Sequence, residues 1–465
     1  MTPYNRIGRS ALRSRWLRGA AAVAAVSAVL AASACDILEV SNPNNVIEEA
    51  LNNAAAAPPL VNGLVASTTR ALSSIFGSYS TATDELMWVG SRDAYNQLDR
   101  GAISEQSNEF VDLSLFYIYE ARYVANNAIN RLVGFGFEDA AASDNSKLLL
   151  ARAFLYSAVI YTTIADQFDD FAFSDKTIAG DNIGPANMVQ LYDSAVSYLN
   201  RAEPLAVAIE DDAALGDILA MRARVKHARA VWDLLNPSGT VPSNPLVNDA
   251  GANADAQAAL ALLSGDHKLR VEVTPPLSDG NVAIGFNVNS RLEMTFDTVR
   301  FINPDAAGKK PHAVNPVKLR DPITNAVDPV MLDFIEEFVE AKDSPELTIV
   351  SQREMYLILA EAALAAGNTA GFTAQINLLR ALDGLTPYSG QIPARTLLVH
   401  SRSVNLYLQG RALSDLYRFG RQAPGWAAGE DAVTCPGIFF TITVSERLAN
   451  PNFSDSPSGA GACGL

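Results

Sequence analysis

The stretch Arg353-Glu-Met-Tyr-Leu-Ile-Leu-Ala-Glu-Ala362 indicates the fold class of this chain more clearly than any other segment. Its apolar residues recur at helical spacing and form one face of a helix predicted over residues 351–366. Gly367 and Asn368 are residue types that commonly end a helix, and a second helical pattern follows over residues 369–382. The segment therefore predicts two helices that are joined by a short turn and pack against each other.

Further helical patterns lie on both sides of this pair. Before it they cover residues 116–132, 146–168, 188–205 and 217–235. After it, residues 395–419 are predicted to form one long helix, whose polarity pattern is interrupted at Gly410 and Arg411. Because alanines let neighbouring helices approach closely, we expect successive antiparallel pairs. The predicted fold class is mainly α, with degenerate tetratricopeptide-like helix pairs in an α-α superhelix.

The middle of the chain, residues 236–342, has a different character. Proline, glycine and asparagine are frequent there, and helical periodicity gives way to short β-prone runs. These runs cover residues 269–273, 282–288 and 295–302. We expect an irregular insert with a few short strands.

The N-terminal segment has the layout of a bacterial export signal. Five arginines and no acidic residue precede the apolar run 19–30, which ends in Ala31-Ala-Ser-Ala-Cys35. The run is too short for a permanent span, which needs about 20 apolar residues. We expect residues 1–34 to be a lipoprotein signal peptide and Cys35 to carry lipid. Ala32 stands where lipoprotein signals favour leucine, so ordinary secretory cleavage remains the alternative.

The net charge of the chain excludes some classes of binding partner. The formal charge is −16, and removal of the five signal arginines makes it −16 − 5 = −21. Such an acidic chain is a poor candidate for binding nucleic acid or anionic lipid through its surface, so membrane attachment would come from the lipid on Cys35.

Besides Cys35, the chain has two cysteines, Cys435 and Cys463. We expect a disulfide between them that holds the C-terminal tail, with two free thiols as the alternative.

Several ordered motifs resemble those of the SusD/RagB family of surface lipoproteins. They are residues 152–168, the helix pair with residues 353–362 and 376–380, residues 402–420 with Leu406-Tyr-Leu-Gln-Gly-Arg411, and residues 439–452 with Asn450-Pro-Asn452. Gln409, Asn405 and Asp169-Asp170 depart from the family pattern. The resemblance implies one SusD-like domain over residues 35–465. Its parts would be a helical scaffold at about 47–235 and 343–420, the insert at about 236–342, and a C-terminal segment at 421–465.

The resemblance also implies a function and partners. The chain would be an outer-membrane, lipid-anchored protein facing the cell exterior that captures an oligosaccharide, a peptide or a similar oligomer. It would deliver this cargo to a SusC-like TonB-dependent transporter and act as the transporter's lid.

Residues 84–100 are the best candidate for a ligand surface. They combine aromatic and planar polar side chains, which suit the C–H faces and the hydroxyl groups of a sugar-like ligand. The candidate ligand-binding residues are Trp88, Arg92, Asp93, Tyr95 and Asn96. The alternative is that Trp88 packs beneath a loop. A second, weaker set in the insert is Phe286, Phe296, Phe301 and Asn303, whose phenylalanines also suit a core.

A search for catalytic motifs favours a protein that is not an enzyme and needs no cofactor or metal. The four histidines lack ligand spacing, and the motifs of metalloproteases, P-loops and serine hydrolases are absent from the sequence. Glu361 and Asp415, beside Arg380 and Arg411 in the motifs, are expected to form ion pairs that fix helix packing. Two other hypotheses remain: a surface glycoside hydrolase with a carboxylate pair, and a structural envelope protein that mediates only protein contacts.

Overall fold

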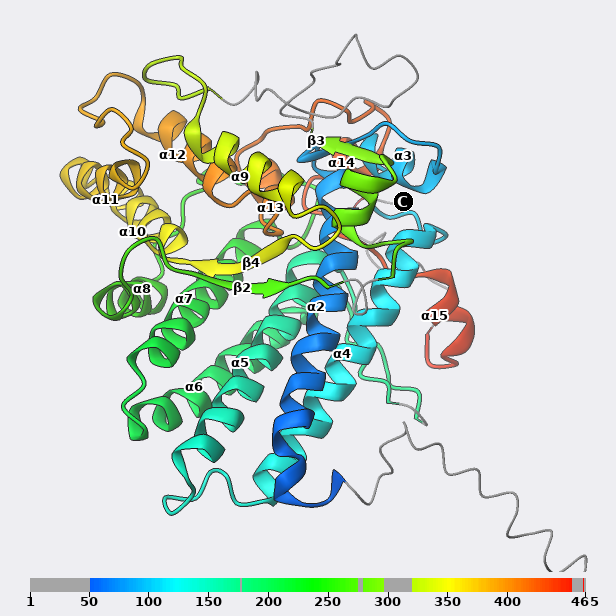
Figure 1. Cartoon of the computed structure of the whole chain (residues 1–465). Helices are drawn as coiled ribbons and strands as arrows, with labels where there is room; N and C mark the ends of the chain where they lie inside the picture. Colours follow the sequence, from blue (N-terminus) through cyan, green and yellow to red (C-terminus); the bar gives the residue numbers. More distant parts are fainter. Residues whose placement is uncertain (1–50, 176–177, 275–278, 297–319, 454–462, 464–465) are drawn as a thin grey trace, which may run out of the picture. The chain divides into compact units, whose positions relative to one another are not determined.

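The computed structural model describes residues 51–175, 178–274, 279–296, 320–453 and 463 (Figure 1). Its contacts separate Met1–Asn53 from Ala54–Leu465, and every element below belongs to the second unit. The expected signal peptide (residues 1–34) and Cys35 lie outside the described residues.

Long helices make up most of this unit, and the helices predicted before and within the 353–380 motif are present. They are α4 (Glu109–Gly134), α5 (Asp144–Gln167), α6 (Val189–Ala208), α7 (Asp212–Leu235), α10 (Gln352–Ala365) and α11 (Thr369–Ala381). A further long helix, α2 (Ala57–Ala82), precedes them and was not among the predicted ranges. Side-chain caps decide where several of them begin. Asn108 accepts the backbone N–H of Phe110 at 3.1 Å ahead of α4, and Ser351 accepts that of Glu354 at 3.3 Å ahead of α10.

The helices pack in chain order, each against the next. α2 contacts α4, and the contacts continue through α5, α6 and α7 to α8 (Ala250–Leu262), which contacts α10, and α10 contacts α11. Figure 1 shows the same succession, with α2 and α4 side by side and α5, α6 and α7 following. α5 is apolar and long enough to span a membrane, but most of its surface is buried inside the protein, as in the central helix of a core. The predicted α-α superhelix is confirmed.

The insert contains more helix than predicted. The N-cap of α8 is Asp249, and the helix packs along α7. α9 (Pro329–Glu340) begins after its N-cap Asp328, whose side chain accepts the backbone N–H of Val330. The prediction of an irregular insert was wrong for these two segments. α8 is rich in alanine and α9 starts with a proline at its first turn, and both features are compatible with a helix.

Short strands are present, and two of the three predicted β-prone runs contain one. β2 (Lys268–Glu272) pairs antiparallel with β4 (Glu346–Ser351), and β1 (Leu86–Trp88) pairs antiparallel with β3 (Met294–Phe296). The strand predicted at residues 282–288 was wrong: this stretch turns into the π-helix η6 (Phe286–Ser290). Since nearly all of its residues are buried, an apolar run there did not distinguish a strand from a helix. Residues 297–302 of the third predicted strand lie outside the described residues.

The single long helix predicted at residues 395–419 is two helices, α12 (Ala394–Asn405) and α13 (Ala412–Arg418). Leu408 and Gly410 between them have positive φ angles of 54° and 74°, which a helix does not accommodate. Gly410 also lies close to α5: a Cβ at this position would be 2.8 Å from Nε2 of Gln167. The interruption seen in the polarity pattern is therefore a complete turn.

Buried ion pairs hold α13 against α10 and α12. Asp415 is bonded by Arg402 and Arg418, each at 2.8 Å. Glu361 on α10 contacts Arg418 at 3.1 Å, Arg402 at 3.4 Å and His227 of α7 at 3.2 Å. The structural role predicted for Glu361 and Asp415 is confirmed, but the expected arginine partners were wrong. Arg380 instead pairs with Asp321 at 2.9 Å, and Arg411 pairs with Glu354 at 2.8 Å.

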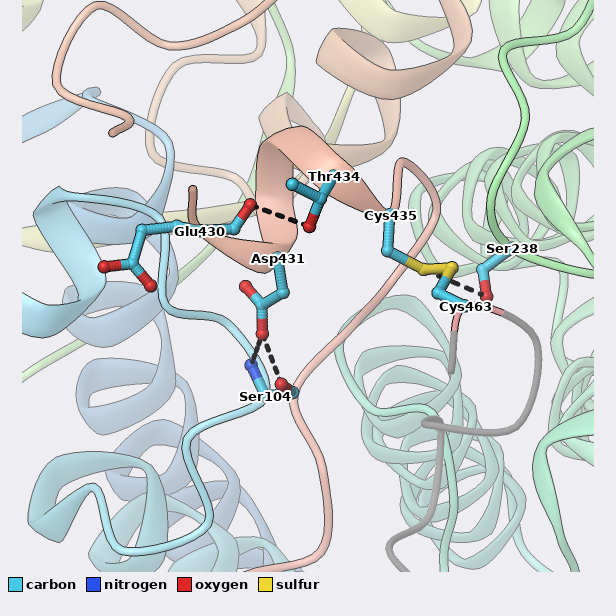
Figure 2. The surroundings of a disulfide bond; sticks show 7 residues. All are labelled: Ser104, Ser238, Glu430, Asp431, Thr434, Cys435 and Cys463. Atoms are coloured by element: carbon cyan, nitrogen blue, oxygen red, sulfur yellow. Dashed lines mark hydrogen bonds between the residues drawn. A yellow bond between two sulfur atoms is a disulfide. The ribbon is translucent and has the colours of Figure 1, made fainter. Parts of the chain in front are cut away.

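The remaining short elements lie mostly in connections and in the C-terminal segment. They are η3 (Ala54–Ala56), α3 (Asp93–Asp99), η4 (Pro185–Asn187), α14 (Asp431–Thr434) and α15 (Val444–Ala449). A disulfide joins Cys435, directly after α14, to Cys463, with 5.9 Å between the Cα atoms (Figure 2). The Asp431 carboxylate accepts the backbone N–H groups of Ile103 and Ser104 at 2.7 Å each. These contacts hold the C-terminal segment on the first part of the domain.

Candidate functional site

The segment after α2, residues 84–100, is built from β1, a tight turn and α3. Sequence reasoning placed a loop here. β1 is held by β3 of the insert, with Leu86 opposite Phe296 and Trp88 opposite Met294. Leu86 and Phe296 are both buried, so this small sheet anchors the segment to the core.

A turn at Gly90, Ser91 and Arg92 closes around the carboxylate of Glu293. The backbone N–H groups of Ser91 and Arg92 donate to one oxygen of Glu293 at 2.7 and 3.1 Å, and the Ser91 hydroxyl donates to the other at 3.1 Å. A Cβ at position 90 would lie 1.8 Å from that first oxygen, so the turn needs glycine for this close approach. The buried acid thus fixes the backbone that carries Arg92.

The two aromatic candidates of this segment are less available than sequence reasoning expected. Tyr95 is 1 % exposed, and its ring stacks on Phe110 with 3.8 Å between centroids, so it supports α3 from below. Trp88 is half-buried against the core, and its backbone N–H donates to Asp99 at 2.9 Å. Its indole nitrogen is buried, with no hydrogen-bond acceptor among the described residues. A Trp donor usually finds a partner when buried, so the ring has an unused polar edge.

The polar candidates do lie together at the surface. Asp93 is exposed in the first turn of α3, and Asn96 donates to it at 3.1 Å. The Arg92 guanidinium lies over the Phe110 ring, 5.4 Å from its centroid, and is 3.8 Å from a Glu109 oxygen. Carboxylate, amide and guanidinium groups are therefore presented side by side, which is the donor and acceptor set that suits hydroxyl-rich ligands.

Sequence reasoning missed three residues that the insert brings to this surface. Besides Glu293, they are Asn281 and Arg291: the Asn281 side-chain oxygen accepts from Arg92 and from Arg291, at 3.4 Å each. The residues Arg92, Asp93, Asn96, Asn281 and Arg291 are all at least partly exposed, and this group is called the loop cluster below. The sequence Asp279-Gly-Asn281 is typical of a turn. No local pattern, however, indicated that Asn281 would contact Arg92, which lies 189 residues earlier in the chain.

The second predicted set divides between core and surface. Phe296 is fully buried, with its ring edge-to-face on Phe338 at 5.4 Å and on Phe334 at 6.4 Å, so the core alternative applies to it. Phe286 is half-buried in η6. Phe301 and Asn303 lie outside the described residues.

A hollow of about 340 Å³ between residues 83–85 and the α12–α13 region is lined by two carboxyl groups with shifted pKa values, Glu85 and Asp415. Burial raises the pKa of Glu85 to about 8, although Leu408 and Ser80 donate to its oxygens. Burial also opposes ionisation of Asp415, but the charges of Arg402 and Arg418 lower its pKa. Since both oxygens of Asp415 are bonded to these arginines, it is a structural anion.

Metal chemistry has no cluster to support it in the described part of the chain. There, no group of three or more His, Cys, Asp or Glu side chains is placed to hold a metal ion.

No model of a known protein family matches the sequence, and no curated protein matches it. Solved structures do match. A SusD superfamily protein from Bacteroides thetaiotaomicron superimposes with a TM-score of 0.58 at 13 % identity, covering 87 % of this chain and 99 % of its own. A SusD superfamily protein from Bacteroides fragilis gives 0.57 at 14 % identity, with 86 % and 99 % covered. A SusD-like carbohydrate binding protein from Bacteroides vulgatus gives 0.54 at 14 % identity, with 86 % and 97 % covered. The likeness extends over nearly the whole of each chain, and so this chain has the SusD-like fold.

Proposed function

We propose that this protein is a non-enzymatic surface protein that binds oligosaccharide. It would be anchored through lipid on Cys35 at the outer membrane and would deliver its cargo to a TonB-dependent transporter, acting as the transporter's lid. The fold supports this proposal, since one solved structure with the same fold is a SusD-like carbohydrate binding protein. Stacked helices also offer a broad, preorganised surface for docking on a barrel.

The observation that carries the proposal is the loop cluster. It combines guanidinium and amide groups in the hydrogen bonds of Arg92 and Arg291 to Asn281 with the amide–carboxylate pair Asn96–Asp93, and the half-buried Trp88 belongs to the same segment, residues 84–100. Neutral sugars are bound by such planar polar groups together with an aromatic face. The acidic charge of the chain disfavours an anionic cargo.

A binding screen tests the cargo. The mature protein would be titrated by calorimetry with neutral oligosaccharides derived from starch, β-glucan and xylan, and the mixtures would be analysed for products by chromatography. We expect one class to bind and to be recovered intact. Release of shorter sugars would favour the hydrolase hypothesis, and absence of any binding would favour a purely structural protein.

Variants of the loop cluster test the site. Arg92→Ala and Trp88→Ala should weaken oligosaccharide binding by about tenfold or more, which corresponds to about 1.4 kcal/mol. Matched controls lie on α7: Arg229 is an exposed arginine paired with Asp193, and Trp232 is a half-buried tryptophan. Arg229→Ala and Trp232→Ala should leave the affinity unchanged. If the control variants lost as much affinity as the Arg92 and Trp88 variants, the ligand would not bind specifically at the loop cluster.

The anchor and the partner need separate tests. Cys35→Ser should move the protein from the membrane fraction to the soluble fraction, and mass spectrometry of the wild type should find an acylated N-terminal cysteine. A detergent pull-down of the tagged wild type from its native envelope should recover a large TonB-dependent barrel. Absence of a barrel beside an acylated Cys35 would contradict the delivery role but not the binding role.

A further inference from the structure

A second hollow lies along α4 on the side that carries the C-terminal segment. Its volume is about 570 Å³, within the range of about 300–1,000 Å³ typical of ligand pockets. α4, residues 174–175 and α15 line it. In Figure 1, α15 lies beside α4 on the side away from α2. This space is called the α4–α15 hollow below.

One face of α4 forms the apolar wall of this hollow. Residues 112, 115, 116, 119, 120 and 123 all line it, and their spacing of three and four positions places them on one side of a helix. Phe116 is 60 % exposed, an unusual position for a phenylalanine. Tyr119 is held in place by Phe171, against which its ring stacks at 4.7 Å. The wall is thus an ordered aromatic surface that is open to a partner.

Among the described residues that line this hollow, the charged ones are all acidic. Asp112, Glu120, Asp175 and Glu446 line the hollow, and none of the described lining residues is a lysine or an arginine. Glu120 is balanced by Arg70 at 3.2 Å. Asp112 accepts the hydroxyl groups of Thr443 and Ser445, and Glu446 accepts the amide of Asn450 at 3.3 Å. Within the described residues neither Asp112 nor Glu446 has a cationic partner.

Two groups next to the wall, Tyr119 and Arg122, respond to or contribute to the local charge. Burial, and after it the Glu446 carboxylate, raise the pKa of Tyr119, as expected for a phenol beside a negative charge. Arg122 is the nearest cation on the same helix, but it is buried: it donates to the carbonyl oxygen of Ser174 and lies over the rings of Phe171 and Phe173. Its charge is therefore already engaged behind the wall.

We propose that the α4–α15 hollow docks a basic segment of a partner protein. An arginine or lysine of that segment would lay its apolar stem along Phe116 and place its cation near Asp112 and Glu446, through cation–π and charge-assisted contacts. The lining contains no Asn, Gln or Trp among the described residues, so it lacks the planar amides that the loop cluster offers to sugars. The acidic residues that line the hollow disfavour the binding of anionic ligands. The hollow is thus a protein contact, separate from the proposed oligosaccharide site.

A labelled peptide tests this proposal. The binding of a fluorescein-labelled peptide of about ten alternating arginines and leucines to the mature protein would be measured by fluorescence anisotropy. The measurement would be repeated as the salt concentration is raised from about 50 to about 300 mM, which weakens charge contacts. We expect binding that weakens with salt and falls by about tenfold in Phe116→Ala and in Glu446→Gln. Both side chains are at least partly exposed, so these variants should fold, and circular dichroism would verify this.

Controls separate the hollow from the general acidity of the chain. Leu378 of α11 is a half-exposed apolar residue, and Asp233 of α7 is an exposed acid in a surface pair with Arg229. Leu378→Ala and Asp233→Asn should bind the peptide as the wild type does, and a glutamate–leucine peptide should not bind.

Three outcomes would overturn the proposal: equal loss in all four variants, unchanged affinity in the two hollow variants, or competition between the peptide and a bound oligosaccharide. A failure here leaves the test of the loop cluster unaffected, because that test uses different residues and a different ligand.

Discussion

Glu361 of α10 and Arg418 of α13, which are 57 residues apart in the chain, form an ion pair in which both side chains are completely buried. Arg402 of α12 and His227 of α7 contact the same carboxylate, so two further helices converge on this anion. Burial opposes ionisation of Glu361, but the charges of Arg418 and then His227 lower its pKa well below the ordinary value of 4.5. The pair connects the motif helix to the C-terminal part of the domain.

Replacement of Glu361 by glutamine should destabilise the protein strongly. The variant removes one of the two carboxylates that contact the buried Arg418 guanidinium and leaves only Asp415, and breaking a buried pair costs about 3–5 kcal/mol. Chemical denaturation followed by circular dichroism would measure the shift of the midpoint. The surface pair Arg229–Asp233 supplies the control: Asp233→Asn should change the stability by less than about 1 kcal/mol.

The sign of the pH dependence follows from the lowered pKa. The folded protein keeps Glu361 ionised where the unfolded chain takes up a proton, so stability is present above about pH 4.5 and is lost as the pH falls further. This acid-side loss should be smaller in Glu361→Gln. An equal acid-side loss in both proteins would show that other carboxylates dominate it.

Glu85 should give the opposite dependence. Burial raises its pKa from 4.5 to about 8, so between these values the folded state holds a proton that the unfolded chain has released. Stability from this group is complete below about pH 4.5 and is lost as the pH rises to about 8, by about 1.4 kcal/mol for each pH unit at most. Glu85→Gln should remove this slope, since glutamine does not titrate.

Unfolding midpoints measured between about pH 5 and pH 9 would check this expectation. Glu138→Gln is the control, because Glu138 lies at the surface in a pair with Arg201 at 2.8 Å. The control should reproduce the wild-type slope. A Glu85→Gln protein that still loses stability over this range would assign the effect to another group.

Gly90→Ala should disturb both stability and ligand binding. The new methyl group would overlap the Glu293 carboxylate, which must then give up its bonds to the N–H groups of Ser91 and Arg92. Loss of such buried bonds costs about 1–3 kcal/mol, and Arg92 loses its fixed position. Gly63→Ala in α2 is the matched control, because no atom lies within 4 Å of its new Cβ. There alanine should stabilise the helix by about 0.5–1 kcal/mol.

Removal of the Cys435–Cys463 disulfide should lower the stability without changing the fold. The bridge closes a segment with a sequence separation of 28, for which chain entropy alone predicts about 3–4 kcal/mol. Thermal unfolding of Cys463→Ser against the wild type, each with and without reductant, would measure this. Reductant should lower the wild-type midpoint and leave the variant unchanged. A reductant effect of equal size in both proteins would mean that the bridge is not the cause.

The helical scaffold was predictable because its signals are local. The pattern at residues 353–362, the cap at Ser351 and the ending at Gly367-Asn368 all act within a few residues, and α10 and α11 match the predicted ranges within one residue. α8 was missed although its cap on Asp249 is just as local, because alanine-rich segments show little contrast between an apolar face and a polar face.

The candidate site was predictable only in part. The sequence identified residues 84–100 by composition, and Arg92, Asp93 and Asn96 lie together at the surface. It did not indicate that Tyr95 would be buried beneath them, because α3 turns that side chain toward Phe110. Nor did it connect Arg92 to Asn281 and Glu293, which are 189 and 201 residues away.

By itself, the sequence determined most of the long helices, their pairing in chain order and the structural role of Glu361 and Asp415, since helical hydrogen bonds and adjacent packing need only nearby residues. The tertiary structure alone decided which arginines pair with those acids, and that Asn281 and Glu293 of the insert contact Arg92. These contacts join segments far apart in the chain, and their geometry depends on how every intervening helix packs.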